Sequence, residues 1–283
     1  MPEYTPHVAL IQFPGSNCEW ETKRAAEAAG IPCDVFRWNR DPALLDDYDG
    51  YIIGGGFSYQ DRIRSGVIAV KEPIIKRVFD EVTEKGKPCI GICNGAQVLV
   101  EAGLIPGINA GKVEMALAPN FRDPEGRIAG FCCRWVYLKH ACKSGRSQFT
   151  SAMPENYVWP VPIAHGEGRY TTRIADLLDT LHANDQIVFQ YCDADGNVDP
   201  ARSVNPNGAL ENIAALCNPE GNVMAIMPHP ERASFLRQIP GELDRAWGNT
   251  KIAAWGDLSA MNGAGPGRLV FESMKAALAA VPA

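Results

Sequence analysis

The sequence predicts an α/β fold in which helices cover both faces of a mostly parallel β-sheet. Short apolar runs alternate with stretches of helical spacing throughout the first third of the chain. Glycine and proline residues stand near the ends of the helical stretches, where they favour helix termination and initiation. A repeated order of strand, helix and strand is typical of parallel sheets with helices on both faces.

The first part of the chain supplies four expected strands and three expected helices. Apolar runs place the strands at residues 7–12, 33–38, 51–53 and 88–92. Ser16 and Glu19 have the spacing of a capping box, which predicts a helix that ends at Gly30. The other two helices are expected between Pro73 and Gly86 and over residues 94–103.

The second part of the chain is richer in strand patterns. Strands are expected at residues 131–138, 157–165, 186–191, 213–217 and 222–227. An amphipathic helix is expected at residues 267–281, and the weak periodicity of residues 235–266 predicts an irregular insertion before it. The sequence contains no repeats, so we expect a single domain over residues 1–283.

Composition and charge exclude several classes of function. The net charge is −6 without a block of like charges, which argues against nucleic acid or anionic lipid as a partner. No run approaches the roughly 18 apolar residues of a membrane helix, and no secretory signal is evident, so we expect a cytoplasmic protein. The nine cysteines form no CxxC pair, which predicts reduced thiols and no metal site. We expect the adjacent Cys132 and Cys133 in the core.

Cys93 is the strongest candidate nucleophile. It lies in Gly91-Ile92-Cys93-Asn94-Gly95, between an apolar strand and a helix, which is the setting of a nucleophile elbow. The helix N-terminus would favour a thiolate and offer N–H groups to a developing oxyanion. The alternative is a buried cysteine in a tight turn.

A base and its orienting group are expected in the segment MPHPER (227–232), which follows an apolar strand. The two prolines should keep this segment extended, so that His229 and Glu231 point to the same side. Glu231 could then accept the proton-bearing nitrogen of His229 and leave the other nitrogen for Cys93. The alternative is a solvated loop histidine beside a surface ion pair.

Two glycine-rich segments also follow expected strands. Residues 54–56 are three glycines, which form either a flexible turn or a turn that completes an oxyanion hole with the amide of Asn94. The segment HGEGRY (165–170) forms either a polar hairpin or a loop that places Glu167 and Arg169 beside a zwitterionic amino acid.

Four motifs together resemble a known family. GGFSYQDRIRSG (55–66), GICNGAQ (91–97), HGEGRY (165–170) and MPHPER (227–232) are similar to motifs of the glutaminase component of phosphoribosylformylglycinamidine synthase, a class I glutamine amidotransferase. The resemblance covers residues from about 7 to 235 and the last helix. It implies the flavodoxin-like fold of class I glutamine amidotransferases.

The resemblance also implies roles for individual residues. Cys93 would attack the side-chain amide of glutamine and form a thioester, while His229, held by Glu231, would protonate the leaving ammonia and activate water. Gly56 and Asn94 would supply oxyanion N–H groups. The residues near the glutamine pocket would be Gly55, Gln97, His165, Gly166, Glu167 and Arg169.

A synthetase subunit is the partner that the resemblance implies. Using ATP and magnesium, it would convert formylglycinamide ribonucleotide into the amidine with the released ammonia, in purine biosynthesis. The resemblance allows a third, small subunit as well. The chain itself has no GxxxxGK[ST] loop and needs no cofactor of its own in this interpretation.

Two departures from the family pattern and three alternatives remain. Gln60 stands where the family commonly has glycine, which puts the geometry of its loop in question, and residues 235–266 are longer than in compact bacterial relatives. The alternatives are a glutaminase that serves a different synthetase, a stand-alone γ-glutamyl hydrolase, and a non-catalytic subunit of the same fold.

Overall fold

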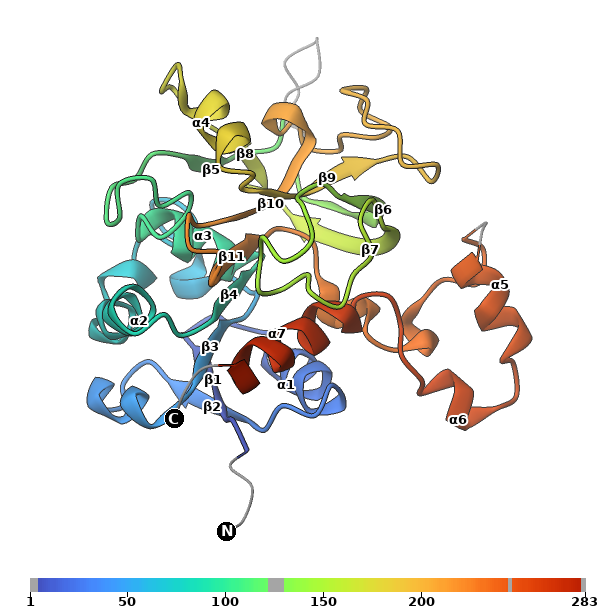
Figure 1. Ribbon diagram of the computed structural model, residues 1–283, viewed down its shortest axis with the longest axis horizontal. Coiled ribbons are helices and arrows are strands. Elements are labelled where there is room, and N and C mark those ends of the chain that lie inside the picture. The colour runs from blue at the N-terminus through green and yellow to red at the C-terminus, as the bar shows by residue number, and fades with distance from the viewer. Residues whose placement is uncertain (1–4, 122–129, 244–245, 281–283) are drawn as a thin grey trace.

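The computed structural model describes residues 5–121, 130–243 and 246–280, and a nine-stranded sheet is its central feature (Figure 1). The strand order is β2-β1-β3-β4-β11-β10-β9-β6-β7. The strands are β1 Val8–Gln12, β2 Cys33–Arg37, β3 Gly50–Ile53, β4 Cys89–Ile92, β6 Cys132–His140, β7 Val158–His165, β9 Ile187–Cys192, β10 Ile213–Cys217 and β11 Val223–Ile226.

The sheet has a parallel part and an antiparallel part. The neighbours from β2 to β11 pair in parallel, whereas β10, β9, β6 and β7 are added antiparallel. The strands β3, β4 and β11 are buried along their whole length. This explains their continuous apolar sequences, since a parallel strand covered on both faces has no solvent side. The predicted α/β fold is confirmed.

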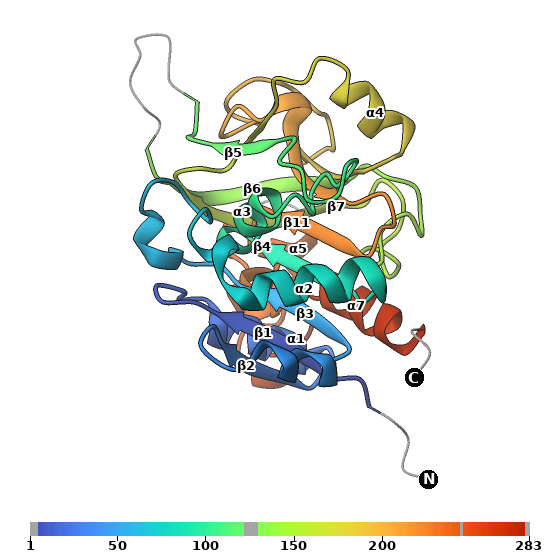
Figure 2. The ribbon, with the colours of Figure 1, turned by 90° about the vertical axis from the view of Figure 1, so that its left-hand side faces the viewer.

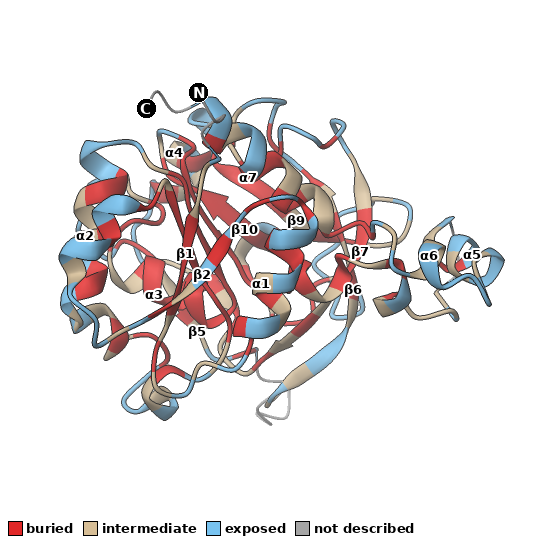
Figure 3. Cartoon of the chain, turned by 90° about the horizontal axis from the view of Figure 1, so that it is seen from below, coloured by how far each residue is buried: buried red, intermediate tan, exposed pale blue. Residues whose placement is uncertain are grey.

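Helices cover both faces of the parallel part. Helices α1 (Glu19–Ala28) and α7 (Arg268–Ala280) lie on one face, and α2 (Pro73–Glu84) and α3 (Asn94–Glu101) lie on the other (Figure 3). Figure 2 looks onto the face that α2 and α3 cover. Pro73 occupies the first turn of α2, where its missing N–H costs no hydrogen bond. No helix among the described residues is long and apolar enough to cross a membrane.

The predicted capping box at the start of α1 is wrong. The helix begins at Glu19 with Cys18 as its N-cap, and the Ser16 hydroxyl instead accepts the N–H of Phe13 at 3.0 Å. Ser16 pairs with Gly56 in an isolated antiparallel bridge, which holds the chain extended at this point. The Glu19 carboxylate accepts the amide of Gln12 at 2.8 Å. Tertiary contacts therefore take both side chains away from the helix end.

Two short strands and one short helix outside the predicted set belong to the middle of the chain. Strands β5 (Ala116–Ala118) and β8 (Arg169–Thr171) form a separate two-stranded sheet, and α4 (Leu177–Ala183) precedes β9. Elements this short carry too few residues for a clear periodicity. The expectation of core cysteines at the start of β6 is also wrong, because Cys133 is exposed and Cys132 is only partly buried.

Residues 235–266 are not irregular throughout. They contain α5 (Ala246–Ala253) and α6 (Leu258–Met261), which project from the body of the molecule as a lobe (Figure 1). Neither helix buries a broad apolar face, so the sequence lacks the periodicity that reveals a packed helix. The Asp257 carboxylate caps α6 by accepting the N–H groups of Ser259 and Ala260. Positions 244–245 and 281 of the predicted elements lie outside the described residues.

Candidate active site

Cys93 lies at the carboxyl end of β4, directly before α3. Its backbone angles are φ +52° and ψ −106°, a conformation that residues other than glycine rarely adopt. Its N–H donates to the Ile226 carbonyl at 2.8 Å, and its carbonyl accepts the N–H of Gln97 at 3.2 Å. Both peptide groups are thus fixed, and the side chain is held at the sheet edge in the geometry of the predicted elbow.

His229 reaches the same edge from the neighbouring strand. Strand β11 pairs with β4 so that Ile226 lies opposite Ile92, and His229 follows three residues after Ile226. Nδ1 of His229 lies 2.5 Å from Oε1 of Glu231, so the imidazole donates and the carboxylate accepts. The pair that the sequence predicts is therefore present and completely buried.

The backbone that carries this pair differs from the prediction. Residues 230–233 form a turn of 3-10 helix with Pro230 at its first position, rather than extended chain. Proline is tolerated there, because the first N–H groups of a helix have no intrahelical partner. The contact between His229 and Glu231 therefore arises from a tight turn.

Gly55 is the point at which the catalytic side chains converge. A Cβ on this residue would lie 3.0 Å from Cε1 of His229 and 3.5 Å from Cβ of Cys93. It would also lie 2.9 Å from Sγ of Cys18. Real Cβ atoms essentially never come as close as 2.9 Å to another atom, and 3.0 Å is closer than nearly all observed Cβ contacts. The bare α-carbon of Gly55 thus allows Cys93 and His229 to meet.

Charge is distributed unequally over the two buried histidines. Burial alone would lower the pKa of His229, but the Glu231 carboxylate and the Cys93 sulfur outweigh it and raise this pKa well above its usual value. Burial, with a smaller effect of His229, lowers the pKa of His165 to about 3. The site therefore favours an imidazolium at 229 and keeps a neutral imidazole at 165.

The tautomer of His165 follows from its partner. Oδ1 of Asn120, which can only accept, lies 3.1 Å from Nδ1 of His165 and also takes the N–H of Gly168 at 3.2 Å. Nδ1 of His165 must therefore carry the proton. Nε2 is then an acceptor, and it has no hydrogen-bond partner among the described residues.

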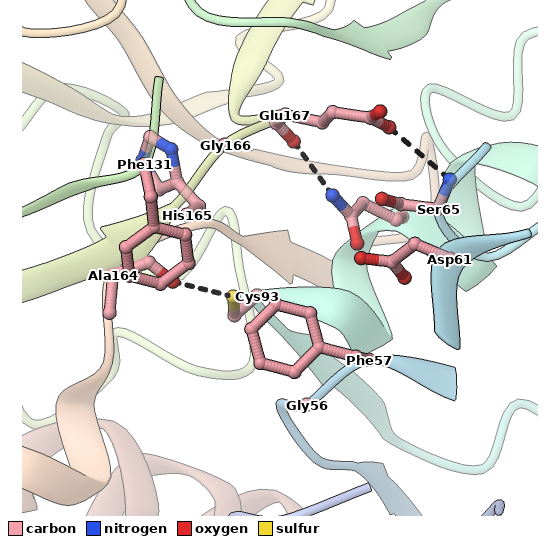
Figure 4. A pocket seen from close by; sticks show the side chains of 11 residues that line it. Gly56, Phe57, Asp61, Ser65, Cys93, Phe131, Ala164, His165, Gly166 and Glu167 are labelled. Carbon is pink, nitrogen blue, oxygen red and sulfur yellow. Dashed lines mark hydrogen bonds between the residues drawn. The ribbon is translucent and has the colours of Figure 1, made fainter. Parts of the chain in front are cut away.

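A small pocket reaches Cys93 from the surface (Figure 4). Its volume is about 160 Å³, below the ~300–1,000 Å³ of most ligand sites, so it suits a molecule of the size of one amino acid. The Cys93 thiol donates to the Ala164 carbonyl at 3.6 Å on one wall. The lining residues are Gly56, Phe57, Asp61, Ser65, Cys93, Gln97, Phe131, Ala164, His165, Gly166 and Glu167.

Hydrogen bonds between distant motifs hold this pocket together. The Gln97 amide donates to the Glu167 carbonyl at 2.7 Å, and the Glu167 carboxylate accepts the N–H of Ser65 at 3.2 Å (Figure 4). The Asn94 amide donates to the Gln97 side chain at 2.9 Å and accepts the N–H of Ser58 at 3.1 Å. Three of the sequence motifs therefore meet around one cavity.

The predicted pocket residues divide into those that line the cavity and those that do not. Gly56, Gln97, His165, Gly166 and Glu167 line it. Gly55 lies behind Cys93 instead, and the Asn94 side chain is turned into the loop network. The backbone N–H groups of Gly56 and Asn94 remain the predicted oxyanion donors, and that of Asn94 belongs to the first turn of α3, where N–H groups have no intrahelical partner.

Arg169 does not line this pocket. Its Nε donates to the Pro119 carbonyl at 3.0 Å, and its side chain lines a separate surface depression with Arg64 and Glu101. Side chains alternate along strand β8, so the burial of Tyr170 on one face directs Arg169 to the other.

Several site residues were not predicted. Asp61, Ser65 and Phe57 lie within the quoted GGFSYQDRIRSG motif, which could have indicated them. Phe131 belongs to no such motif, and its place follows only from the fold. The same is true of Cys18, which lies next to Gly55 and does not line the pocket. The rings of Phe57 and Phe131 lie 6.1 Å apart at the pocket. Burial raises the pKa of Asp61, and the nearby Glu167 carboxylate adds to this effect against the Ser65 hydroxyl.

The loop that contains Gln60 has an unusual backbone. Tyr59, Gln60, Asp61 and Ile63 all have positive φ, with +61° at Gln60. This is the region that favours glycine, so the family's glycine suits this position better than the glutamine of this chain. The Gln60 side chain accepts two hydrogen bonds from the Arg62 guanidinium, at 3.0 and 3.2 Å, which partly compensate.

Comparison with known proteins places the chain in a family. The model of the CobB/CobQ-like glutamine amidotransferase domain matches residues 5–258. The phosphoribosylformylglycinamidine synthase subunit PurQ of Methanothrix thermoacetophila is 43% identical over 95% of this chain and 96% of its own length. The chain belongs to the PurQ family. The PurQ subunit of Pyrococcus furiosus is 42% identical over 80% of this chain and 88% of its own length.

Solved structures agree with membership of the PurQ family. A chain in the structure of PurLQS from Thermotoga maritima has a TM-score of 0.69 and 30% identity, covering 97% of this chain and 100% of its own. The glutaminase domain of Trypanosoma brucei CTPS has a TM-score of 0.56 at 15% identity over 99% of this chain and 96% of its own, which supports the fold alone. The glutamine amidotransferase fold expected from the sequence is confirmed.

Proposed function

We propose that this PurQ-family chain is the cytoplasmic glutaminase subunit of phosphoribosylformylglycinamidine synthase. It hydrolyses L-glutamine and passes ammonia to a synthetase subunit in purine biosynthesis. The observation that carries the proposal is the convergence of Cys93 and the buried His229–Glu231 pair on Gly55, beside a small pocket. This is the arrangement of nucleophile, base and orienting group that amide cleavage requires.

The reaction follows from this arrangement in two halves. The Cys93 thiolate attacks the side-chain carbonyl of glutamine, and the N–H groups of Gly56 and Asn94 stabilise the oxyanion. His229, kept protonated by Glu231, gives a proton to the departing nitrogen, so ammonia leaves and a γ-glutamyl thioester forms. His229 then takes a proton from water, which attacks the thioester and releases glutamate and the Cys93 thiolate, so the thiolate and the protonated His229 are restored.

The pocket walls suit the amino-acid end of glutamine. The carboxylates of Asp61 and Glu167 both line the cavity, and a negative wall attracts the α-ammonium group. The unpartnered Nε2 of His165 offers an acceptor to an N–H donor of the substrate. Arg169 has no part in this binding mode.

The rest of the synthetase chemistry belongs to partner chains. The sequence contains no GxxxxGK[ST] loop, so we assign ATP and magnesium to the synthetase subunit. The Thermotoga maritima relative is described as part of PurLQS, which supports an assembly of this chain with a large synthetase subunit and a small third subunit.

A reconstituted complex tests the proposal. We expect Cys93→Ala to reduce glutamine-dependent synthesis by on the order of 10³-fold or more, since it removes the nucleophile. Synthesis from added ammonia should be unchanged, because the synthetase is intact. The matched control is Cys133→Ala, which removes an exposed thiol and should leave both rates unchanged.

Two outcomes would contradict the proposal. Undiminished glutamine-dependent synthesis by Cys93→Ala would make this chain a non-catalytic subunit. High glutaminase activity of the isolated chain, without stimulation by a synthetase, would instead favour a stand-alone γ-glutamyl hydrolase. A different synthetase that accepts the ammonia equally well would reassign the partner alone.

A further inference from the structure

Cys18 is a further thiol that the fold brings to the catalytic pair. It ends the loop between β1 and α1, and its Sγ and Cε1 of His229 lie 2.9 and 3.0 Å from the Cβ position on Gly55. Burial raises the pKa of the Cys18 thiol to about 11, although Nη2 of Arg232 donates to the sulfur at 3.2 Å, so the thiol has to release its proton before it can bind a metal. Cys18 is buried and does not line the pocket, and no step of the proposed reaction uses it.

Cys18, His229 and Glu231 form a compact set of donor atoms. The Cys18 sulfur, an imidazole nitrogen and a carboxylate oxygen all lie within 4.8 Å of one another. Nε2 of His229 and Oε2 of Glu231 are buried and have no hydrogen-bond partner in the described part of the chain. Buried polar atoms normally have partners, so Nε2 of His229 beside the thiols indicates a place where a ligand can supply the missing contact.

The chemistry of the donors selects the class of ligand. Thiolate sulfur and imidazole nitrogen suit Zn²⁺, whereas Mg²⁺ prefers oxygen ligands alone. The hydrogen bond from Nδ1 of His229 to Glu231 leaves Nε2 available, and a carboxylate behind a histidine is the common support of a zinc-binding imidazole. Glu231 therefore supports the imidazole and does not bind the ion, and Cys93, whose Cβ lies 3.5 Å from the Cβ position on Gly55, is placed to supply the third donor beside Cys18 and His229.

We propose that Cys18, Cys93 and His229, with Glu231 behind the imidazole, form an inhibitory zinc site. Zn²⁺ bound there occupies the imidazole nitrogen and the Cys93 sulfur that the reaction needs, so glutamine is no longer attacked. Each thiol that ligates the ion releases its proton, and the protonated His229 releases the proton on Nε2, so binding weakens as the pH falls and a chelator reverses it. The inhibition rests on the proposed function, whereas the binding of the ion does not.

Binding is tested on the full chain without any assay of activity. The metal-free chain is titrated with Zn²⁺ and, separately, with Co²⁺, whose thiolate complexes absorb light through sulfur-to-metal charge transfer. We expect one tight ion per chain and a charge-transfer band. Cys18→Ser should weaken binding by about 100-fold or more, because it removes a ligand. The control Cys133→Ser should bind as the unmodified chain does.

Inhibition is tested in the complex with the synthetase. Zn²⁺ should abolish glutamine-dependent synthesis and spare synthesis from added ammonia, which separates this site from any effect on the synthetase. Cys18→Ser should retain glutamine-dependent synthesis in metal-free buffer and lose the sensitivity to Zn²⁺. Added Mg²⁺ should not inhibit either form.

Several results would overturn the zinc site. The absence of a charge-transfer band in the unmodified chain does so without any variant, even if Cys18→Ser fails to fold. Unchanged Zn²⁺ affinity or sensitivity in a folded Cys18→Ser chain does so directly. If Zn²⁺ binds through Cys18 but glutamine is never hydrolysed, the proposed function fails and the site stands. If glutamine is hydrolysed regardless of Zn²⁺, the reverse holds.

Discussion

The carboxyl edge of the parallel strands and the α5–α6 lobe are built in opposite ways. At the edge, buried side chains crowd around Gly55, and Cys93 and Gln60 adopt backbone angles that favour glycine. In the lobe, Trp255 is 81% exposed, and a Cβ on Gly241 would meet nothing within 4 Å. The edge holds a strained backbone and crowded side chains in a defined geometry, whereas the lobe makes few contacts that a substitution can break.

The largest effect is expected from Glu231→Gln at the edge. This substitution removes the negative charge that raises the pKa of His229. It also removes the carboxylate that accepts the hydrogen bond from Nδ1 and so orients the ring. We expect glutamine hydrolysis in the complex to fall on the order of 10³-fold. The limb of the pH–rate profile that reports His229 should move to lower pH.

The control for this variant is Glu242→Gln in the lobe, where the side chain is exposed. It should leave the rate and the pH profile unchanged. A normal rate or an unshifted pH profile in Glu231→Gln would show that Glu231 does not orient and charge His229.

A smaller effect is expected from Gly55→Ala, compared with Gly241→Ala. The new Cβ at 55 has to displace the His229 ring, the Cys18 sulfur or both, and a displacement of about 1 Å costs on the order of 10²-fold in rate. The same substitution at 241 meets open space and should leave activity and stability unchanged. Steady-state kinetics and thermal unfolding of both variants check this. Equal activity of the two would mean that Gly55 is not needed for the approach of Cys93 and His229.

Gln60→Gly examines the strained loop beside the pocket. Relief of the left-handed backbone is worth roughly 1 kcal/mol, and the greater freedom of glycine when unfolded costs roughly 0.5–1 kcal/mol. We therefore expect a change in the free energy of unfolding between zero and about 0.5 kcal/mol in favour of the variant, measured with denaturant. Gln60→Ala is the control: like the glycine variant it loses the bonds from Arg62, but it keeps the strain, so it should be less stable than Gln60→Gly. A glycine variant that is less stable than the unmodified chain would show that those bonds and the freedom of unfolded glycine outweigh the strain.

The smallest effect is expected from Trp255→Ala in the lobe. An exposed side chain outside a packed core contributes little, so the free energy of unfolding should change by less than about 0.5 kcal/mol. Glutaminase activity of the complex should be unchanged. A loss of ammonia transfer with normal assembly would contradict this prediction and give the lobe a role that its packing does not suggest.

Local patterns were enough to predict the central features of the site. The apolar run before Cys93 and the spacing of His229 and Glu231 place chemistry at strand ends, and both features are present in the structure. The order of the strands decides which residues meet, and it is not visible in any short segment. The place of Cys18 beside His229 was not predicted for this reason. The direction of Arg169 was not predictable either, because a side chain on a three-residue strand points according to what packs beneath that strand.

The fold was predicted most accurately where elements bury a face. Helix α2 and the continuous apolar strands have the periodicity of buried elements, and their bounds were close to those observed. Helices α5 and α6 were missed because they bury few residues, so no hydrophobic pattern marks them. The capping box at Ser16 failed because a bridge to Gly56 competes for the same segment.

Because β4 pairs directly with β11, the distance between the catalytic groups does not depend on the length of the chain between them. The Cys93 N–H donates to the Ile226 carbonyl, so the residues that carry the sulfur and the imidazole follow two adjacent, hydrogen-bonded strands. The segment from α3 to β10 leaves this pair of strands after β4 and returns to it at β11. Insertions or deletions in that segment can reshape the mouth of the pocket or the surface that contacts a partner chain, while the distance between the reacting atoms stays the same.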